Sequence, residues 1–182
     1  MDFFKTNTDD VIIIFPKIFG DKRGYFLETF REEEFLSHNI GPKFVQDNHS
    51  GSQKGVLRGL HYQIRQAQGK LIRVVAGEIY DVVLDIRKNS NTFGQWTGVF
   101  LSSEYKQQLW VPPGFAHGFL VVSEWAEVTY KATDYYAPQF ERTILWNDPD
   151  LDIRWPLIPG QDPIISAKDE KGIAFKDAEY FL

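Results

Sequence analysis

Two histidines in apolar, glycine-punctuated surroundings are the residues of this chain best suited to acid–base chemistry. His61 lies in the run GVLRGLHYQ (55–63), and His117 lies in the run WVPPGFAHGF (110–119). An ionisable ring in an apolar segment is costly unless it has a partner or a function. The prolines and glycines around the rings hold the backbone close to whatever the rings face. The two segments therefore predict one pocket lined by both imidazoles.

The cations around His61 favour an anionic ligand over a purely structural role for the ring. Arg58 and Lys70 flank it in the sequence, and neither has an obvious counter-ion there. The alternative is a core histidine whose hydrogen bonds are satisfied internally. Strict alternation puts Arg58 and His61 on opposite faces of a strand, so both reach one pocket only if the strand is irregular. Gly59 permits such a bulge.

A metal site is a further alternative that the residue types disfavour. Barrel proteins often bind a metal through a His-x-His pair, a later carboxylate and a further histidine. Here Gln63 stands where the second histidine would be, and Lys70 stands where the carboxylate would be, so only His117 remains. An ammonium group repels a divalent ion. We therefore expect no metal and no other cofactor.

The elements that must position these residues are predicted to be β-strands. Apolar residues occupy every even position from Ile79 to Arg87, while Asp81, Asp85 and Arg87 share the other face, which predicts a strand with one buried side. Similar segments, separated by turn residues, are 11–15, 24–30, 44–48, 56–62, 71–75, 96–101, 107–111, 117–123, 126–135 and 142–146. Short strands at this spacing predict an all-β sandwich or barrel.

Helix is expected in only a few short stretches. The clearest one covers residues 31–40, with acidic residues in its first turn and Gly41-Pro42 at its end. From about residue 155 the alternation stops, and three prolines predict a wrapping tail with one helical turn near 166–171.

Size and composition favour one cytoplasmic domain over residues 1–182. The chain has 182 residues, 43% of them hydrophobic, and no apolar run of membrane-spanning length. It has no cysteine, which fits a reducing compartment. The net charge of −5 argues against nucleic-acid binding. A small anionic ligand would need a local basic cluster, for which the candidates are Arg23, Arg58, Lys70, Arg73 and Lys168.

Several long and unusual blocks carry a resemblance that runs nearly end to end. They are QDNHS (46–50), VLRGLHYQ (56–63), QGKL (68–71), 82–87, PGFAHGF (113–119), YKAT (130–133), WND (146–148) and SAKD (166–169). In these blocks the chain resembles the dTDP-4-dehydrorhamnose 3,5-epimerase family. The resemblance implies a cupin-type jelly roll with a few short helices. It also implies a metal-independent homodimer that exchanges N-terminal strand material.

The resemblance implies roles for four catalytic residues, which fit the chemistry of inverting a carbon beside a ketone. Such a reaction needs a base on one face, an acid on the other and a stabilised enolate between them. His61 matches the base and Tyr130 the acid. Asp169 would orient the His61 ring, and Lys70 would lie near the ketone oxygen. Taken singly, Asp169 reads as a solvated charge, Tyr130 as a core ring and Lys70 as a surface residue.

A nucleotide-sugar substrate also needs its diphosphate held and its base stacked. By resemblance, the phosphate positions are Arg23, Arg58 and Lys168, and the polar positions for base or sugar are Glu28, Gln46, Asn48 and Glu141. Phe19 and Phe26 are candidate stacking rings, Asp47 lies in the same matched block, and His117 lines the sugar region.

Other functions remain open at this stage. Related enzymes invert only one carbon of a dTDP-4-keto sugar or move the ketone instead. The alternative from another class of function is a jelly-roll module that binds a nucleotide sugar without catalysing its conversion. That module would lose the base or the acid, whereas His61 and Tyr130 are both present.

Overall fold

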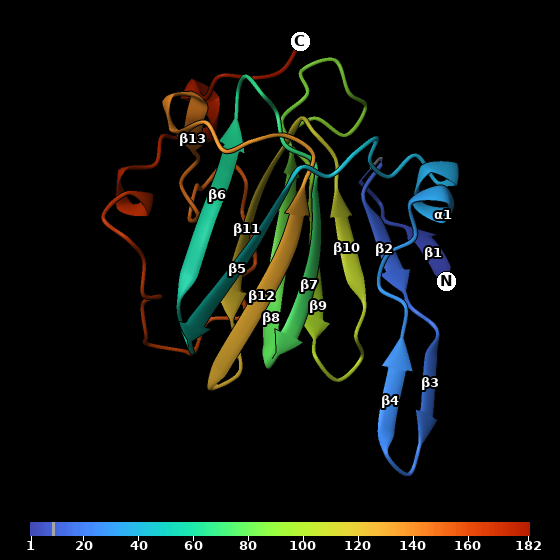
Figure 1. Cartoon of the computed structure of the whole chain (residues 1–182). Helices are drawn as coiled ribbons and strands as arrows, with labels where there is room; N and C mark the ends of the chain where they lie inside the picture. The colour runs from blue at the N-terminus through green and yellow to red at the C-terminus, as the bar shows by residue number, and fades with distance from the viewer. Residues whose placement is uncertain (9) are drawn as a thin grey trace.

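Two antiparallel β-sheets face each other and form the body of the protein (Figure 1). The structure is a computed structural model and describes residues 1–8 and 10–182. The larger sheet has the order β1-β2-β10-β7-β12-β5, with β1 Asp2–Lys5, β2 Ile12–Phe15, β10 Gln108–Val111, β7 Lys70–Ala76, β12 Trp125–Ala132 and β5 Gln46–Gln53. The second sheet has the order β13-β6-β11-β8-β9, with β13 Glu141–Thr143, β6 Leu57–Gln63, β11 Phe115–Val121, β8 Glu78–Asp85 and β9 Trp96–Ser102. The predicted all-β class is confirmed.

Helical structure is sparse, as the sequence predicts. Helix α1 covers Glu32–Ser37, which is shorter than the predicted 31–40 because the chain turns at His38. The 3-10 turns cover Pro138–Phe140, Asp169–Lys171 and Phe175–Asp177, and the second of these confirms the helical turn predicted in the tail. None of the helices in the described part of the chain has the length and apolar character needed to cross a bilayer.

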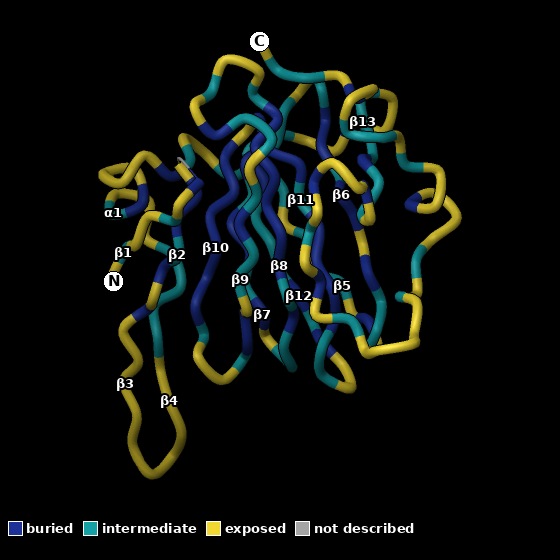
Figure 2. The backbone as a smooth tube through the Cα atoms, turned by 180° about the vertical axis from the view of Figure 1, so that it is seen from behind, coloured by how far each residue is buried: buried dark blue, intermediate teal, exposed yellow. Residues whose placement is uncertain are grey.

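The main core lies between the sheets. Ile72, Val74 and Leu109 from the larger sheet pack against Val83 and Phe119 from the second sheet. Figure 2 shows the central strands as the most buried part of the backbone. Burying each of these side chains contributes about 1.5–3 kcal/mol, so the two sheets are held together mainly by this layer.

Strand β8 is buried on both faces, which corrects the prediction of one buried side. Val82 and Leu84 of β8 pack with Leu151 and Trp155 of the tail. The other face of β8 carries Asp81, which is fully buried. The strand is therefore buried on both sides rather than on one, because the face of Asp81, which alternation alone leaves open, lies between the two sheets with Ile79 and Val83.

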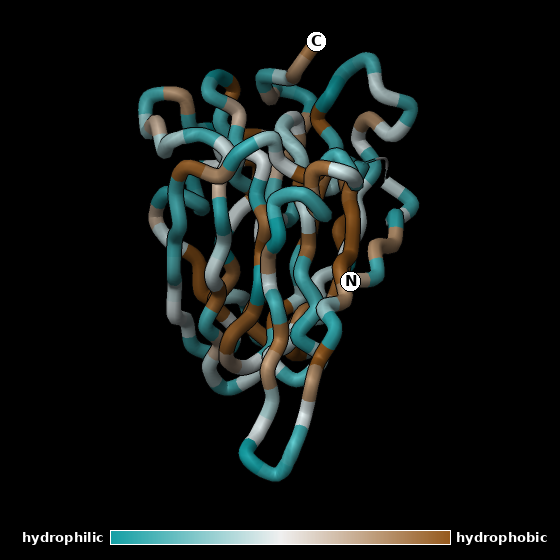
Figure 3. Tube along the Cα trace, turned by 45° about the vertical axis from the view of Figure 1, so that its right-hand side comes forward, coloured by the Kyte–Doolittle hydropathy of each residue, from teal (hydrophilic) through white to brown (hydrophobic). Residues whose placement is uncertain are grey.

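A protruding hairpin at the N-terminal side is the main feature that strand prediction missed. Strand β3 (Ile18–Asp21) pairs with β4 (Gly24–Leu27), where the sequence predicted one strand over 24–30 and none over 18–21. The hairpin extends away from the barrel (Figure 1), and Figure 3 shows its hydrophilic tip. Its aromatic rings are exposed, Phe19 by 52% and Phe26 by 70%.

An irregular pairing of β6 with β11 confirms the predicted bulge. His61 pairs with His117, and Arg58 pairs with Phe119, so β6 has one residue more than β11 in this interval. Gly59 has a φ of +124°, which favours glycine. Gly118 faces it so closely that a Cβ there would lie 2.6 Å from the Arg58 carbonyl oxygen. The bulge lets Arg58 and His61 share the inner face of the sheet.

We predict that Gly118→Ala lowers the free energy of unfolding by about 1–3 kcal/mol, because its methyl group would press on backbone that has no room to move. The measurement is chemical denaturation. Gly51→Ala is the control, since its Cβ would meet only the ring of Trp125, a side chain that is 51% exposed and able to rotate away. Equal losses in the two variants would contradict the close-packing argument.

Candidate active site

His61 and Asp169 form a hydrogen-bonded pair. His61 Nε2 lies 2.5 Å from Asp169 Oδ1, and the Asp169 side chain is only 3% exposed. Burial raises the pKa of Asp169, but the hydrogen bond and charge of His61, with smaller contributions from Ser166 and Lys168, hold that pKa below its ordinary value. Ionised Asp169 accepts a hydrogen bond from Nε2, which leaves Nδ1 of the ring to accept a proton.

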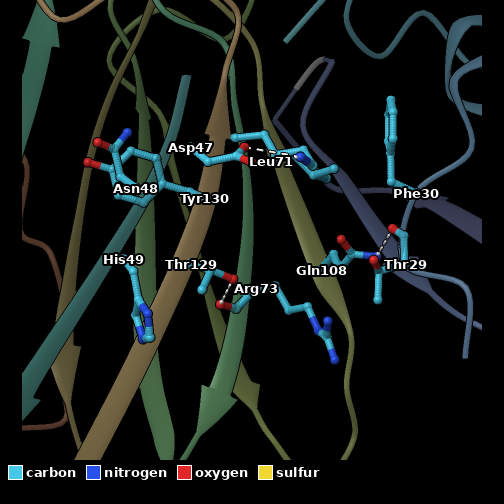
Figure 4. A pocket seen from close by; sticks show the side chains of 11 residues that line it. Thr29, Phe30, Asp47, Asn48, His49, Leu71, Arg73, Gln108, Thr129 and Tyr130 are labelled. Atoms are coloured by element: carbon cyan, nitrogen blue, oxygen red, sulfur yellow. Dashed lines mark hydrogen bonds and ion pairs between the residues drawn. The ribbon is translucent and has the colours of Figure 1, made fainter. Parts of the chain in front are cut away.

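Tyr130 lies on the facing sheet, where β12 pairs with β5. Its partner in the register is Asn48, and Figure 4 shows the phenol ring beside the Asn48 amide. The ring packs against the core between the sheets, so it belongs to the inner face. Burial and the Glu141 carboxylate raise the pKa of Tyr130, while Arg58 opposes them. The phenol therefore keeps its proton at neutral pH and is able to donate it.

Lys70 begins β7 and places an ammonium group in the same interior. Burial lowers the pKa of Lys70 to about 8, although the carboxylates of Glu141 and Asp81 oppose the shift. No hydrogen bond or ion pair of its Nζ is present among the described residues. A cation without a fixed partner is suited to an oxyanion that develops during a reaction.

His117 sits beside His61 in the β6–β11 pairing and binds a carboxylate that the sequence analysis did not assign to the site. Its Nε2 lies 2.9 Å from both carboxylate oxygens of Asp81. Burial raises the pKa of Asp81, and His117 and Lys70 oppose that shift. The signal in the sequence was an aspartate in a run of apolar residues, but alternation alone placed it on an exposed face.

The remaining inner-face residues form a polar rim around these groups. Gln46 Nε2 donates to Asn48 Oδ1 at 3.0 Å, and Arg58 donates to Ser52 across the opening between the sheets. Lys168 Nζ lies 2.5 Å from Glu141 Oε1. The structure thus places Gln46, Asn48, Arg58, Glu141 and Lys168 along the opening between the sheets, which we call the barrel mouth, next to the His61–Asp169 pair.

Four predicted ligand-binding residues do not reach this mouth within one chain. Phe19, Arg23 and Phe26 lie on the protruding hairpin, and Glu28 follows it and pairs with Arg31. The Arg23 side chain is 89% exposed and binds Asp21 at 2.6 Å. Within one chain the hairpin leads these residues away from the barrel, and their role in binding stays a prediction.

Asp47 also lies outside the inner site. Alternation along β5 turns Asp47 to the opposite face from Gln46 and Asn48, and its carboxylate binds Lys131 at 3.0 Å. Adjacency in a sequence block suggested a shared role, but neighbouring residues of a strand point to opposite faces.

A groove on the outer face of the larger sheet is separate from the His61 pair. It is lined from β5, β7, β10 and β12, among others by His49, Arg73 and Gln108, and Asn48 and Tyr130 also contribute to its lining (Figure 4). Neither His61 nor Asp169 lines it. Arg73, a candidate for the basic cluster, lines this groove rather than the mouth that holds Lys70 and Arg58.

The amide of Gln63 is occupied by the loop after β12. Its Nε2 donates to the carbonyls of Gln66 and Tyr135, and its Oε1 accepts from the Ala137 N–H at 2.8 Å. Within residues 1–8 and 10–182, no group of three or more metal-binding side chains is arranged to hold an ion. Gln63 thus holds the loop.

Comparison with known proteins places this geometry in one family. Residues 5–177 match the family model described as dTDP-4-dehydrorhamnose 3,5-epimerase. The dTDP-4-dehydrorhamnose 3,5-epimerase of Pseudomonas aeruginosa is 57% identical over 176 residues, which cover 94% of each chain.

Solved structures agree with the fold. A dTDP-6-deoxy-D-glucose-3,5-epimerase from Legionella pneumophila, in complex with dTDP-4-keto-L-rhamnose, is 51% identical with a TM-score of 0.94 and covers 98% of this chain and 94% of its own. A 3'-monoepimerase from Streptomyces bikiniensis, in complex with dTDP-quinovose, is 33% identical with a TM-score of 0.86 and covers 93% and 85%. The likeness confirms the cupin-type jelly roll.

We predict that Lys70→Met raises the free energy of unfolding at pH 7 by roughly 1–3 kcal/mol, because the folded state no longer buries an ammonium group. The folded pKa of about 8 lies below the unfolded value near 10.4, so between these pH values the unfolded chain binds more protons. Wild-type stability therefore rises relative to the variant across this window. Denaturation at pH 7 and pH 10 measures the difference in free energy of unfolding between Lys70→Met and the wild type, with exposed Lys88→Met as control. A difference that is as large at pH 10 as at pH 7 contradicts the prediction.

Proposed function

The chain belongs to the dTDP-4-dehydrorhamnose 3,5-epimerase family, and we propose that His61 and Tyr130 move the protons of its reaction from opposite faces of the sugar ring. The reaction is an isomerisation. It converts dTDP-4-dehydro-6-deoxy-D-glucose to dTDP-4-dehydro-L-rhamnose by inverting C3 and C5, the two carbons beside the C4 ketone.

The observation that carries the proposal is the position of a paired histidine opposite a protonated phenol. His61, held by Asp169, is on β6 of the second sheet, whereas Tyr130 is on β12 of the larger sheet. His61 Nδ1 takes the proton from the carbon beside the ketone, and the charge moves onto the C4 oxygen. The Lys70 ammonium stabilises that enolate, and Tyr130 returns a proton to the other face.

The degree of similarity favours inversion of both carbons over a single one. The 3,5-epimerase relatives are 57% and 51% identical to this chain, against 33% for the 3'-monoepimerase. A non-catalytic binding module would not need a base and an acid on facing sheets. The His61–Asp169 pair argues for turnover.

The substrate is a dTDP-sugar, and its diphosphate binds the cations at the barrel mouth. We assign Arg58 and Lys168 to the phosphates, and Gln46, Asn48, Glu141 and His117 to the base and sugar. The site works without a metal or another cofactor, and the chain works as one domain, residues 1–182, in the cytoplasm. It needs neither nucleic acid nor membrane.

A second copy of the chain completes each site. The β3–β4 hairpin exposes Phe19, Phe26 and Arg23 away from its own barrel, and exposed aromatic rings of this kind are typical of a docking surface. In the homodimer, each hairpin crosses to the partner, where Arg23 binds a phosphate, Phe19 and Phe26 stack on the base, and Glu28 follows them.

Proton exchange in heavy water tests the two roles. We expect His61→Ala to abolish deuterium incorporation and epimerisation, and Tyr130→Phe to retain some exchange while slowing inversion about 100-fold or more. Proton NMR of dTDP-4-keto-6-deoxyglucose with the enzyme reads out both events. Exposed Tyr105→Phe serves as control, and a parallel assay in excess chelator tests the expected absence of a metal. Near-wild-type turnover in both site variants would remove these residues from the mechanism.

Mixed dimers test the exchange of hairpins. Arg23→Ala and His61→Ala are each expected to be inactive as homodimers. Random pairing makes half of the dimers mixed, and each of these has one site with both residues intact, so about a quarter of the wild-type activity returns. If Arg23 acts in the site of its own chain, every site carries a defect and mixing restores nothing.

A further inference from the structure

The carboxylate of Glu141 joins three segments at the barrel mouth. Glu141 belongs to β13, accepts a hydrogen bond from Lys168 Nζ at 2.5 Å, and accepts another from the Tyr136 hydroxyl at 2.8 Å. Its side chain is 15% exposed. Both carboxylate oxygens are thus engaged by groups that come from the tail and from the loop after β12.

These contacts connect the supports of the base and of the acid. Lys168 directly precedes Asp169, the partner of His61. Tyr136 lies in the loop that follows the strand of Tyr130, and its backbone N–H donates to Gln46 Oε1 at 2.9 Å. On the other side, Glu141 pairs with Gln63 on β6, two residues after His61. A single side chain therefore ties β13, the tail and the β12 loop together.

Glu141 is also a fixed negative charge in this region. Burial raises the pKa of Glu141, but the hydrogen bonds from Lys168 and Tyr136 and the nearby His61 hold it below its ordinary value. The charged or titratable groups that face Glu141 are Lys168 from the tail, Tyr136 from the loop, His61 from β6, Tyr130 from β12 and Lys70 from β7.

The sign of each interaction at Lys70 and Tyr130 is determined by charge. Glu141 raises the pKa of both groups, Asp81 also raises that of Lys70, and Lys168 lowers that of Lys70. Arg58 lowers the pKa of Tyr130. Glu141 and Lys168 are ion-pair partners, yet they act on Lys70 in opposite directions.

We propose that Glu141 is a positioning residue: its carboxylate, fixed by Lys168 and Tyr136, holds the tail against the β12 loop and places a negative charge in the interior that Lys70 and Tyr130 share. The inference rests on the proposed roles of Lys70 and Tyr130 for its catalytic meaning. Because Lys168 also belongs to the phosphate region, the same carboxylate links the diphosphate end of the site to its sugar end.

Titration of Lys70 in two variants tests the inference. Carbon-13 NMR of labelled lysine ε-carbons follows the protonation of Lys70, whose resonance is assigned by its loss in Lys70→Arg. We expect Glu141→Gln to lower the Lys70 titration midpoint by about half a pH unit or more, and Lys168→Met to raise it. Glu141→Asp keeps the charge and is expected to lie closer to wild type than Glu141→Gln.

The opposite shifts separate an electrostatic role from a structural one. A residue that only holds the loop would leave the midpoint in place, or would move it in the same direction when either partner of the ion pair is removed. Either result would overturn the inference. Circular dichroism checks that each variant is folded.

The measurement needs no substrate, so it stands apart from the proposed function. The alkaline limb of kcat/KM reports groups of the free enzyme. If the alkaline limb of the kcat/KM profile shifts in the variants together with the titration midpoint of Lys70, then Lys70 acts in the reaction. If the midpoints move as expected and the limb does not, the role assigned to Lys70 falls while Glu141 still sets its protonation.

Discussion

The bond between His61 and Asp169 is the contact on which the site depends. It joins the second sheet to a tail that follows more than a hundred residues later. A buried carboxylate is unfavourable without a partner, and a basic ring needs a fixed orientation, so each group satisfies the other. The tail reaches this place because Leu151 and Trp155 pack on the outer face of the sheet. Packing of the tail on the outer face of the second sheet thus places the Asp169 carboxylate at the barrel mouth.

The charges inside the barrel are nearly balanced, which reconciles an acidic protein with an anionic substrate. Lys70, Arg58 and Lys168 are the cations of the mouth, and Asp81, Asp169 and Glu141 are the carboxylates close to them. Each carboxylate is hydrogen-bonded, whereas the Lys70 ammonium has no fixed partner in the described chain. The arrangement leaves positive charge available for the enolate of the proposed mechanism, in surroundings of low dielectric that strengthen its effect.

In the proposed homodimer, the hairpin would enlarge the binding site of a small barrel. The mouth of one chain would supply the groups around the sugar, while aromatic rings stand exposed on β3 and β4. Exposed aromatic rings favour association, and a projecting pair of strands allows it without distorting the barrel. Exchange between two copies would bury these rings and complete both sites at once.

Sequence alone determined the all-β class and the bulge at Gly59, because alternation and glycine act over a few neighbouring residues. His61 and Tyr130 were proposed for the reaction from the family resemblance of their sequence blocks. Tertiary structure alone decided the rest. Asp47 turned outward to Lys131, Asp81 turned inward to His117, and the tail packed on the apolar outer face of β8. The role of Glu141 as a link also came from contacts between segments far apart in the chain. Burial and charge pairing depend on which distant segments of the chain come into contact, and the local sequence pattern does not specify those contacts.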